Sequence, residues 1–496
     1  MKIGDLFVGY NDGKKEARFR ENFEHYYFNY NKIYEKILRD DKFLLLGKKG
    51  TGKTILGEYI KKISQANPSW FCDMYSCREL KFEALFALKT KSLKPNEYTA
   101  VWEWLLLIVL AKFILSQKDV RITDVSNRAA EKLRKFLNNC FMHTKLEMNK
   151  IIEITKSKKF SSGFVSKFLN FEKDKDESWK EGVCTYLDYL YDLKETVFEA
   201  LSASQSTYTI ILDELDDQFQ NNELYKSNII SLIKTVDKIN TEFLDRDIKA
   251  KFIIMLRNDI FYILNDSDLN KIEQDNSVKI NWGTVSDEKS PLVNMVLIKL
   301  KQSMSSLGNQ SSIDIEETKQ KLFFDRIQMY KTKGKVKDYG ILEFILGRTF
   351  LRPRDIITFL RLVMDSNPDD EYFTASAVKR VERDYSEYLI KEVKNEMHGH
   401  VDEIIIEESL ALIRQYKRKS FDYTHIKQYY EKNKRLYPHI KIEDTLKLLF
   451  RFSVIGNFWN YKGKSFYSWA YRENTNIDFD KCFNIHIGLR KALNIS

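Results

Sequence analysis

An eight-residue segment near the start of the chain has the residue types and spacing of a phosphate-binding loop. It fits G-x-x-x-x-G-K-[ST] and consists of Gly47, Lys48, Lys49, Gly50, Thr51, Gly52, Lys53 and Thr54. Glycines let the backbone approach phosphate oxygens, so that successive N–H groups and the start of the next helix point at the anion. We therefore expect Lys53 to reach the β- and γ-phosphates of ATP, and the Thr54 hydroxyl to ligate Mg²⁺.

A second group of candidate residues ends the apolar run at 208–212. Asp213 follows this run directly, and we expect it to hold the Mg²⁺ through water beside the phosphates. Glu214 comes next and is the candidate that orients or deprotonates the attacking water. Asp216 and Asp217 extend the acidic run, and we expect them to lie in a solvated turn that caps a helix.

A cationic residue at the end of a strand near the nucleotide can sense the γ-phosphate. Arg257 follows the apolar run at 251–256 and is our candidate for that role, with Asn258 as the neighbour that could replace it. The alternative is a surface arginine after a core strand.

A further arginine pair lies around a proline far along the chain. Pro353 suits the first position of a helix, and Arg352 and Arg354 flank it. From a helical lid either arginine could reach back to the phosphates, and Arg354 is our catalytic candidate. Equally, both could pair with Asp355 or other carboxylates.

These residues need a parallel sheet to bring them together. Residues 42–46 read as a buried strand before the loop, 55–63 as the helix after it, and 70–76 as a second strand. Asp213 lies 159 residues beyond Thr54, so a helical insertion at about 80–205 is expected between the two motifs. The most apolar run, 104–111, is shorter than a membrane span and predicts a buried helix.

The rest of the chain predicts two further parts. We divide it into an ATPase core at 1–265, a helical lid at 266–400 and a C-terminal domain at 401–496. Helical patterns at about 403–416, 421–432 and 442–453 precede aromatic runs at 458–461 and 466–471. Lys462-Gly463-Lys464 lies between these runs and predicts a β-hairpin. Three helices and a hairpin outline a winged-helix-like domain.

Composition narrows the class of protein. The 496 residues are 43% hydrophobic and 31% charged, which is typical of a globular chain. The five cysteines form no CxxC pair, which favours reduced thiols and a cytoplasmic location, and the N-terminus lacks the apolar region of a signal peptide. The net charge of +10 permits a nucleic-acid partner without requiring one.

The order of these motifs resembles that of AAA-type and STAND-type P-loop ATPases. It is most similar to a group of bacterial P-loop ATPases labelled FunZ-like. The segments shared with that group are the loop at 47–54, residues 257–261, Asn281-Trp282 and residues 483–489. Phe7-Val8-Gly9 is similar to the box that opens the STAND nucleotide module, although Tyr10 stands where that box usually has arginine.

The resemblance implies an α/β P-loop NTPase fold of the ASCE type, with an AAA/STAND-like parallel sheet. It also implies ATP binding and hydrolysis with Mg²⁺, a nucleotide-driven switch, and a role in bacterial antiphage defence. The expected partners are further copies of the chain or an effector protein, with no membrane involved.

The alternative is a DNA-binding regulator or loader resembling origin-recognition ATPases, in which ATP is a structural switch. Basic clusters that could contact DNA phosphates non-specifically, or could be solvated faces, are Lys462 and Lys464; Arg414, Lys417, Arg418 and Lys419; and Lys331, Lys333, Lys335 and Lys337. The third C-terminal helix has few side chains suited to reading base edges, so sequence-specific recognition is not expected.

Overall fold

The chain divides into two compact units, each of which is described by itself. The structure, a computed structural model, describes residues 1–78, 97–117, 124–141, 148–157, 186–202, 204–308, 314–330, 336–472 and 476–495. One unit comprises Lys32–Lys48 and Lys53–Ile280, and the other comprises Met1–Asn31, Lys49–Gly52 and Asn281–Ser496. Parts of the predicted insertion at 80–205, and Lys331, Lys333 and Lys335, lie outside the described residues. The division at 265 and 400 stays a prediction.

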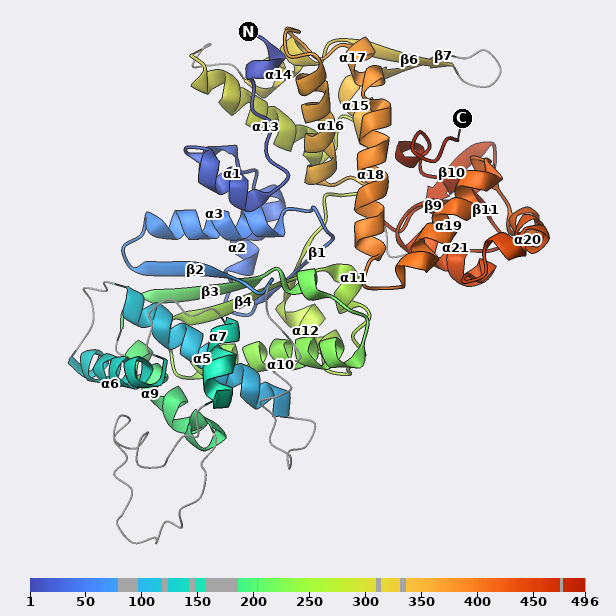
Figure 1. The fold of residues 1–496 in the computed structure, drawn as a ribbon. Helices are drawn as coiled ribbons and strands as arrows, with labels where there is room; N and C mark the ends of the chain where they lie inside the picture. The colour runs from blue at the N-terminus through green and yellow to red at the C-terminus, as the bar shows by residue number, and fades with distance from the viewer. Residues whose placement is uncertain are drawn as a thin grey trace. The chain divides into compact units, whose positions relative to one another are not determined.

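A five-stranded parallel sheet forms the centre of the first unit (Figure 1). Its strands are β1 (Leu44–Gly47), β2 (Trp70–Ser76), β3 (Thr207–Asp213), β4 (Ala250–Leu256) and β5 (Ser277–Ile280). They lie in the order β2-β3-β4-β1-β5, and every neighbouring pair is parallel. β4 therefore separates the strand before the phosphate-binding loop from the acidic strand β3. That order is the ASCE arrangement, and the predicted α/β P-loop NTPase fold is confirmed.

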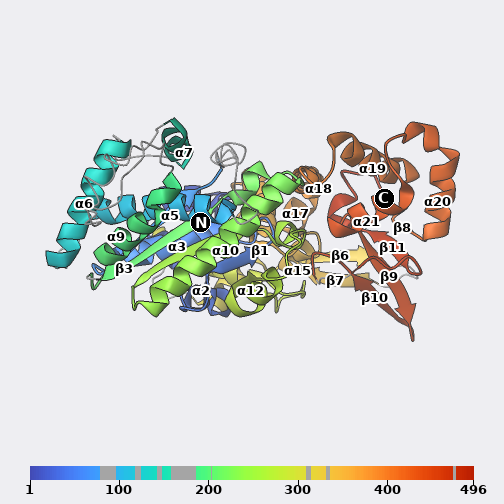
Figure 2. The ribbon, with the colours of Figure 1, turned by 90° about the horizontal axis from the view of Figure 1, so that it is seen from below.

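Helices cover both faces of this sheet, which explains why the three inner strands β1, β3 and β4 are mostly buried. α3 (Lys53–Gln65) lies on one face, and α5 (Glu97–Ser116) and α10 (Glu223–Asp245) lie on the other (Figures 1 and 2). The other α-helices in the described part of this unit are α2 (Ile33–Ile37), α6 (Asp124–Phe141), α7 (Met148–Ser157), α9 (Leu190–Ser202), α11 (Asn258–Phe261) and α12 (Leu269–Asn276). The described part of the insertion before β3 is helical, as expected.

The apolar helix α5 belongs to the interior of this unit. The stretch Thr99–Ser116 is long and apolar enough to cross a membrane by length and composition, yet 72% of it is buried. Trp102 and Trp104 are fully buried, and the Trp102 indole N–H donates to the backbone oxygen of Asn228 on α10 at 3.0 Å. The prediction of a buried helix at 104–111 is confirmed.

The second unit combines helices with two small antiparallel sheets. The α-helices described in it up to residue 397 are α1 (Gly13–Phe19), α13 (Pro291–Ser306), α14 (Ile315–Leu322), α15 (Ile341–Leu346), α16 (Pro353–Ser366), α17 (Ala375–Arg380) and α18 (Glu382–Met397). The mostly helical region predicted after residue 265 also contains strands β6 (Arg326–Tyr330) and β7 (Val336–Gly340), which pair with each other. Exposed and buried residues alternate from Arg326 to Gln328, as is typical of a strand. This strand was not predicted from the sequence.

The C-terminal part follows the predicted order of elements closely. α19 (Glu403–Tyr416), α20 (Tyr423–Lys432) and α21 (Ile442–Arg451) precede a hairpin of β9 (Ile455–Tyr461) and β10 (Lys464–Ser468). Lys462 and Gly463 form its turn with φ angles of 48° and 72°. Two unpredicted strands, β8 (Ser420–Phe421) and β11 (Cys482–Ile485), extend the sheet to the order β10-β9-β11-β8. The assignment as a winged-helix-like domain stays a prediction.

Candidate phosphate-binding site

The loop at 47–54 connects β1 to α3 and has the backbone shape that its glycines allow. Gly50 and Gly52 have φ angles of 78° and 99°, a region that side-chain-bearing residues rarely adopt. α3 begins at Lys53, so its free N–H groups and its positive dipole end follow the loop directly. This arrangement favours an anion at the loop.

Lys53 is buried at the base of the loop. Its ammonium group donates to the backbone oxygens of Gly47 at 2.9 Å and Lys48 at 3.2 Å. Burial lowers the pKa of Lys53, while the neighbouring carboxylates of Asp216 and Asp213 oppose that shift. A buried cation held by carbonyl oxygens lacks a full counter-charge, and a phosphate would supply one.

Thr54 and Asp213 come together although 159 residues separate them. The Thr54 hydroxyl donates to Oδ2 of Asp213 at 2.8 Å. Asp213 is 3% exposed, and burial raises its pKa, while the hydrogen bond from Thr54 acts in the opposite direction. A hydroxyl and a carboxylate are hard oxygen ligands, so this pair fits the donor set that Mg²⁺ prefers.

Glu214 follows β3 with a left-handed backbone, at a φ of 62°. A left-handed glutamate is uncommon and costs free energy, so surrounding contacts must hold it. The Ser76 hydroxyl, at the end of β2, donates to Oε2 of Glu214. Ser76 also pairs in register with Asp213, which places these three residues at the carboxyl edge of the sheet. Ligands of open parallel sheets bind at that edge.

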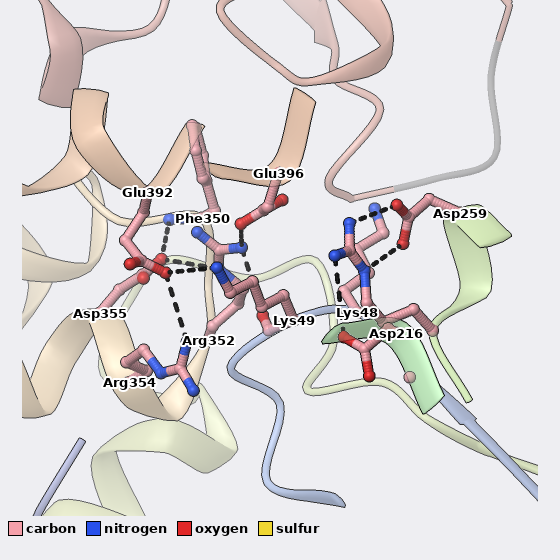
Figure 3. A network of polar contacts seen from close by, with 12 residues as sticks. Lys48, Lys49, Asp216, Asp259, Phe350, Arg352, Arg354, Asp355, Glu392 and Glu396 are labelled. Carbon is pink, nitrogen blue, oxygen red and sulfur yellow. Dashed lines mark hydrogen bonds and ion pairs between the residues drawn. The ribbon is translucent and has the colours of Figure 1, made fainter. Parts of the chain in front are cut away.

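Arg257 follows β4 and is buried, which excludes the alternative of a surface arginine. Its guanidinium donates to both oxygens of Asp259, at 3.0 and 2.5 Å, and lies 3.7 Å from Asp216 (Figure 3). Asp216 is therefore a partner of Arg257 rather than part of a solvated turn. Oδ1 of Asn258 is buried without a hydrogen-bond partner among the described residues. The sensing role of Arg257 stays a prediction.

In the second unit, Arg352 is buried in an ion network before α16 (Figure 3). Its Nε donates to Asp355 at 3.0 Å, and its Nη1 contacts Glu396 on α18 and the backbone oxygen of Lys49 at 3.2 Å. Burial would lower the pKa of Arg352, but the carboxylates of Asp355 and Glu396 outweigh it and raise this pKa. Arg352 is thus committed to a structural network.

Arg354 is the more accessible arginine of the pair. Its Nη1 lies 3.3 Å from Oε2 of Glu392, and its backbone N–H donates to the backbone oxygen of Gly50 at 3.3 Å. The ammonium group of Lys49 lies 3.6 Å from the same oxygen of Glu392 (Figure 3). Two cations therefore share one carboxylate where a phosphate could compete for both. Any contact of Arg352 or Arg354 with phosphate stays a prediction.

Several residues that contact the loop or its neighbouring arginines were not predicted from the sequence. Glu392 and Glu396 lie four residues apart on α18, so they share one helix face, but nothing in the sequence indicates their arginine partners. The Trp282 indole N–H donates to the backbone oxygen of Thr51 at 2.9 Å, and its ring stacks on Tyr30 at 5.3 Å. Asn281-Trp282 is one of the segments shared with the FunZ-like group, but the sequence indicated no role for it.

The N-terminal box packs on α16. Gly9, with a φ of 130°, would bring a Cβ to 3.1 Å from both Ile357 and Glu16. The backbone N–H of Tyr10 donates to Glu16 at 2.9 Å, and the Arg361 guanidinium lies 5.9 Å from the centre of its ring. A cavity of about 400 Å³ adjoins this box.

Comparison with known families finds a match for one part of the chain. Residues 297–394 match the FunZ-associated C-terminal helical domain. This match, which runs from α13 into α18, supports the predicted resemblance to the FunZ-like group. No curated protein matches the chain.

Two solved structures align with most of the chain. The Orc1 protein of Aeropyrum pernix, solved in complex with DNA, has a TM-score of 0.37 and 10% identity, and covers 99% of this chain and 96% of its own. Cdc6p of Pyrobaculum aerophilum has a TM-score of 0.31 and 11% identity, and covers 89% of this chain and 87% of its own. Both TM-scores are below 0.5, so the fold assignment here rests on the strand order.

Proposed function

We propose that this protein binds ATP at residues 47–54 and hydrolyses it with Mg²⁺. The observation that carries the proposal is the contact between Thr54 and Asp213, at the base of a glycine-shaped loop that leads into a helix. Mg²⁺ held by this pair would neutralise charge on the phosphates during the transfer. Lys53 would bind the β- and γ-phosphates, Glu214 would orient or deprotonate the attacking water, and Arg257 and Arg354 would sense the γ-phosphate.

We further propose that hydrolysis serves as a switch in bacterial antiphage defence, in the cytoplasm, with further copies of the chain or an effector protein as partner. The match of residues 297–394 to the FunZ-associated domain supports this assignment. The Arg354 backbone contacts Gly50 in the loop, and its side chain contacts Glu392 on α18. Nucleotide bound at the loop would therefore alter how α16 and α18 are held.

The assay for this function is phosphate release from ATP by the purified full-length chain. We expect saturable turnover with Mg²⁺ and none with EDTA, because the Thr54–Asp213 pair holds the metal. Nucleotide binding without turnover would instead favour the alternative, a DNA-binding regulator or loader in which ATP is a structural switch. Stimulation of turnover by duplex DNA would also favour that alternative.

Glu392 offers a separate test of the loop. Its carboxylate is predominantly ionised: burial raises its pKa, but Lys49, Arg354 and Arg352 outweigh that and lower it. Because this charge competes with phosphate for Lys49 and Arg354, we expect Glu392→Gln to tighten ATP binding by about threefold to tenfold, which is ~1 kcal/mol. A fluorescent-nucleotide titration measures the change.

The matched control is Glu387→Gln, on the same helix, where the side chain is 55% exposed and pairs with Arg383 alone among the described ion pairs. We expect no change in affinity there. Unchanged or weaker binding by Glu392→Gln would mean that Glu392 positions Arg354 instead of competing with the nucleotide.

A further inference from the structure

The β9–β10 hairpin exposes more aromatic surface than a folded domain needs for its own packing. Among the described residues, twelve large hydrophobic side chains are exposed, and three of them lie in this short hairpin. They are Tyr461 at 59%, Tyr467 at 48% and Phe466 at 40%. Such a concentration marks a candidate contact surface.

The strand register gathers two of these rings on one face of the hairpin. Phe466 lies opposite Trp459, with ring centres 5.7 Å apart and planes inclined by 16°. Tyr461 lies two residues beyond Trp459 on β9, opposite Lys464, so it projects from the same face. Tyr467 belongs to the other face, where it pairs with Phe458.

Positive charge borders this aromatic face. From residue 455 to 472 the sequence contains three basic residues and no acidic one. The Lys462 ammonium lies 5.3 Å from the centre of the Tyr461 ring, and Lys481 lies 4.0 Å from that of Trp459. Lys481 also pairs with Asp478 at 3.1 Å. Lys462 and Lys464 form no ion pair within the part of the chain that the structure describes.

The root of the hairpin is fixed, so its tip projects from a rigid base. A Cβ added at Gly456 would approach Trp469 to 2.5 Å, which shows how closely that ring packs on the backbone. Asn457 holds the segment before β11 through two hydrogen bonds with Asp478, at 2.7 and 2.9 Å. The strands that carry the exposed rings are therefore anchored at their base, which limits the ordering that binding requires.

This combination of rings and lysines fits one class of partner. Protein interfaces are enriched in aromatic residues but depleted in lysine, whereas strands of nucleic acid need both stacking surfaces and cations. A duplex keeps its base faces stacked internally, so exposed rings contribute to binding when the bases are unpaired. We propose that the β9–β10 hairpin binds single-stranded nucleic acid, with Tyr461 and Phe466 stacking on bases and Lys462 and Lys464 contacting phosphates.

Fluorescence anisotropy tests this proposal with the full-length chain and no added nucleotide. The probes are labelled oligo(dT) and oligo(rU) of twenty residues and a duplex of twenty base pairs. We expect single strands to bind more tightly than duplex, and Tyr461→Ala with Phe466→Ala to weaken single-strand binding by at least about tenfold. Lys464→Gln should lower the salt dependence by about 0.7 in log–log slope.

Phe19→Ala is the matched control, because Phe19 is an aromatic residue with 62% exposure in the same unit and outside the hairpin. Preference for duplex, equal losses in the control, or no binding of either single strand would overturn the proposal. If neither single strand binds, and a protein partner of the wild-type chain no longer binds Tyr461→Ala, the surface would be assigned to protein docking. Repeating the titration with Lys53→Ala separates this proposal from the ATPase, because the hairpin should bind unchanged.

Discussion

Replacing Lys53 by alanine is expected to abolish nucleotide binding in the micromolar range. The ammonium group now donates to two loop carbonyl oxygens, and its pKa is lowered by burial. Hydrogen bonds to charged groups contribute about 1.5–3 kcal/mol each, so losing the phosphate contacts should raise the dissociation constant by about a hundredfold or more. Titration of a fluorescent ATP analogue measures this directly.

The control for this prediction is Lys62→Ala, which removes an exposed lysine from the last turn of the same helix. It should leave the affinity unchanged. Circular dichroism of Lys53→Ala should show a folded chain, because the substitution removes a buried charge rather than a packing group. Retained affinity in a folded Lys53→Ala protein would place the nucleotide elsewhere.

Glu214→Gln is expected to bind ATP normally and to release phosphate about 10²- to 10⁴-fold more slowly, the range that general acid–base groups contribute. The amide keeps the size of the side chain and can still contact the Ser76 hydroxyl. It cannot accept a proton from water, so the chemical step should slow while the affinity for ATP stays unchanged. Single-turnover phosphate release, with binding measured in parallel, separates the two effects.

Asp217→Asn provides the matched control, since Asp217 belongs to the same acidic run and pairs with Arg78 at 2.6 Å. Turnover should stay within about twofold of the wild-type rate there, as expected for an exposed surface pair. A wild-type rate in Glu214→Gln would remove Glu214 from the catalytic role and leave Asp216 as the next carboxylate to test.

Local patterns predicted the strands of the P-loop fold well. β2 begins and ends where the sequence indicated, although it contains Asp73 and is only half-buried. β3 and β4 exceed their predicted runs by one or two residues, and their continuous apolar runs indicated burial on both faces. β5 was not predicted, because Ser277–Ile280 is four residues long and polar at every second position. The small strands β8 and β11 depend on pairing partners far along the chain, which no local pattern contains.

The candidate site shows the same limit. Asp213 ends a predicted core strand, and Thr54 lies after the loop that follows another. Because parallel strands share a carboxyl edge, the two residues could be placed together from the sequence. The contacts of Ser76, Glu392 and Glu396 could not, because a serine at a strand end and two glutamates on a helix have many possible partners. Their roles depend on tertiary packing rather than on spacing.

The most direct test of the central claim is a crystal structure with a non-hydrolysable ATP analogue and Mn²⁺ in place of Mg²⁺. The anomalous signal of Mn²⁺ locates the metal independently of the nucleotide density. Our account predicts one site per chain, beside the Thr54 hydroxyl and the Asp213 carboxylate, with the β- and γ-phosphates enclosed by residues 47–54. A metal site away from this pair, or phosphates bound outside the loop, would contradict it.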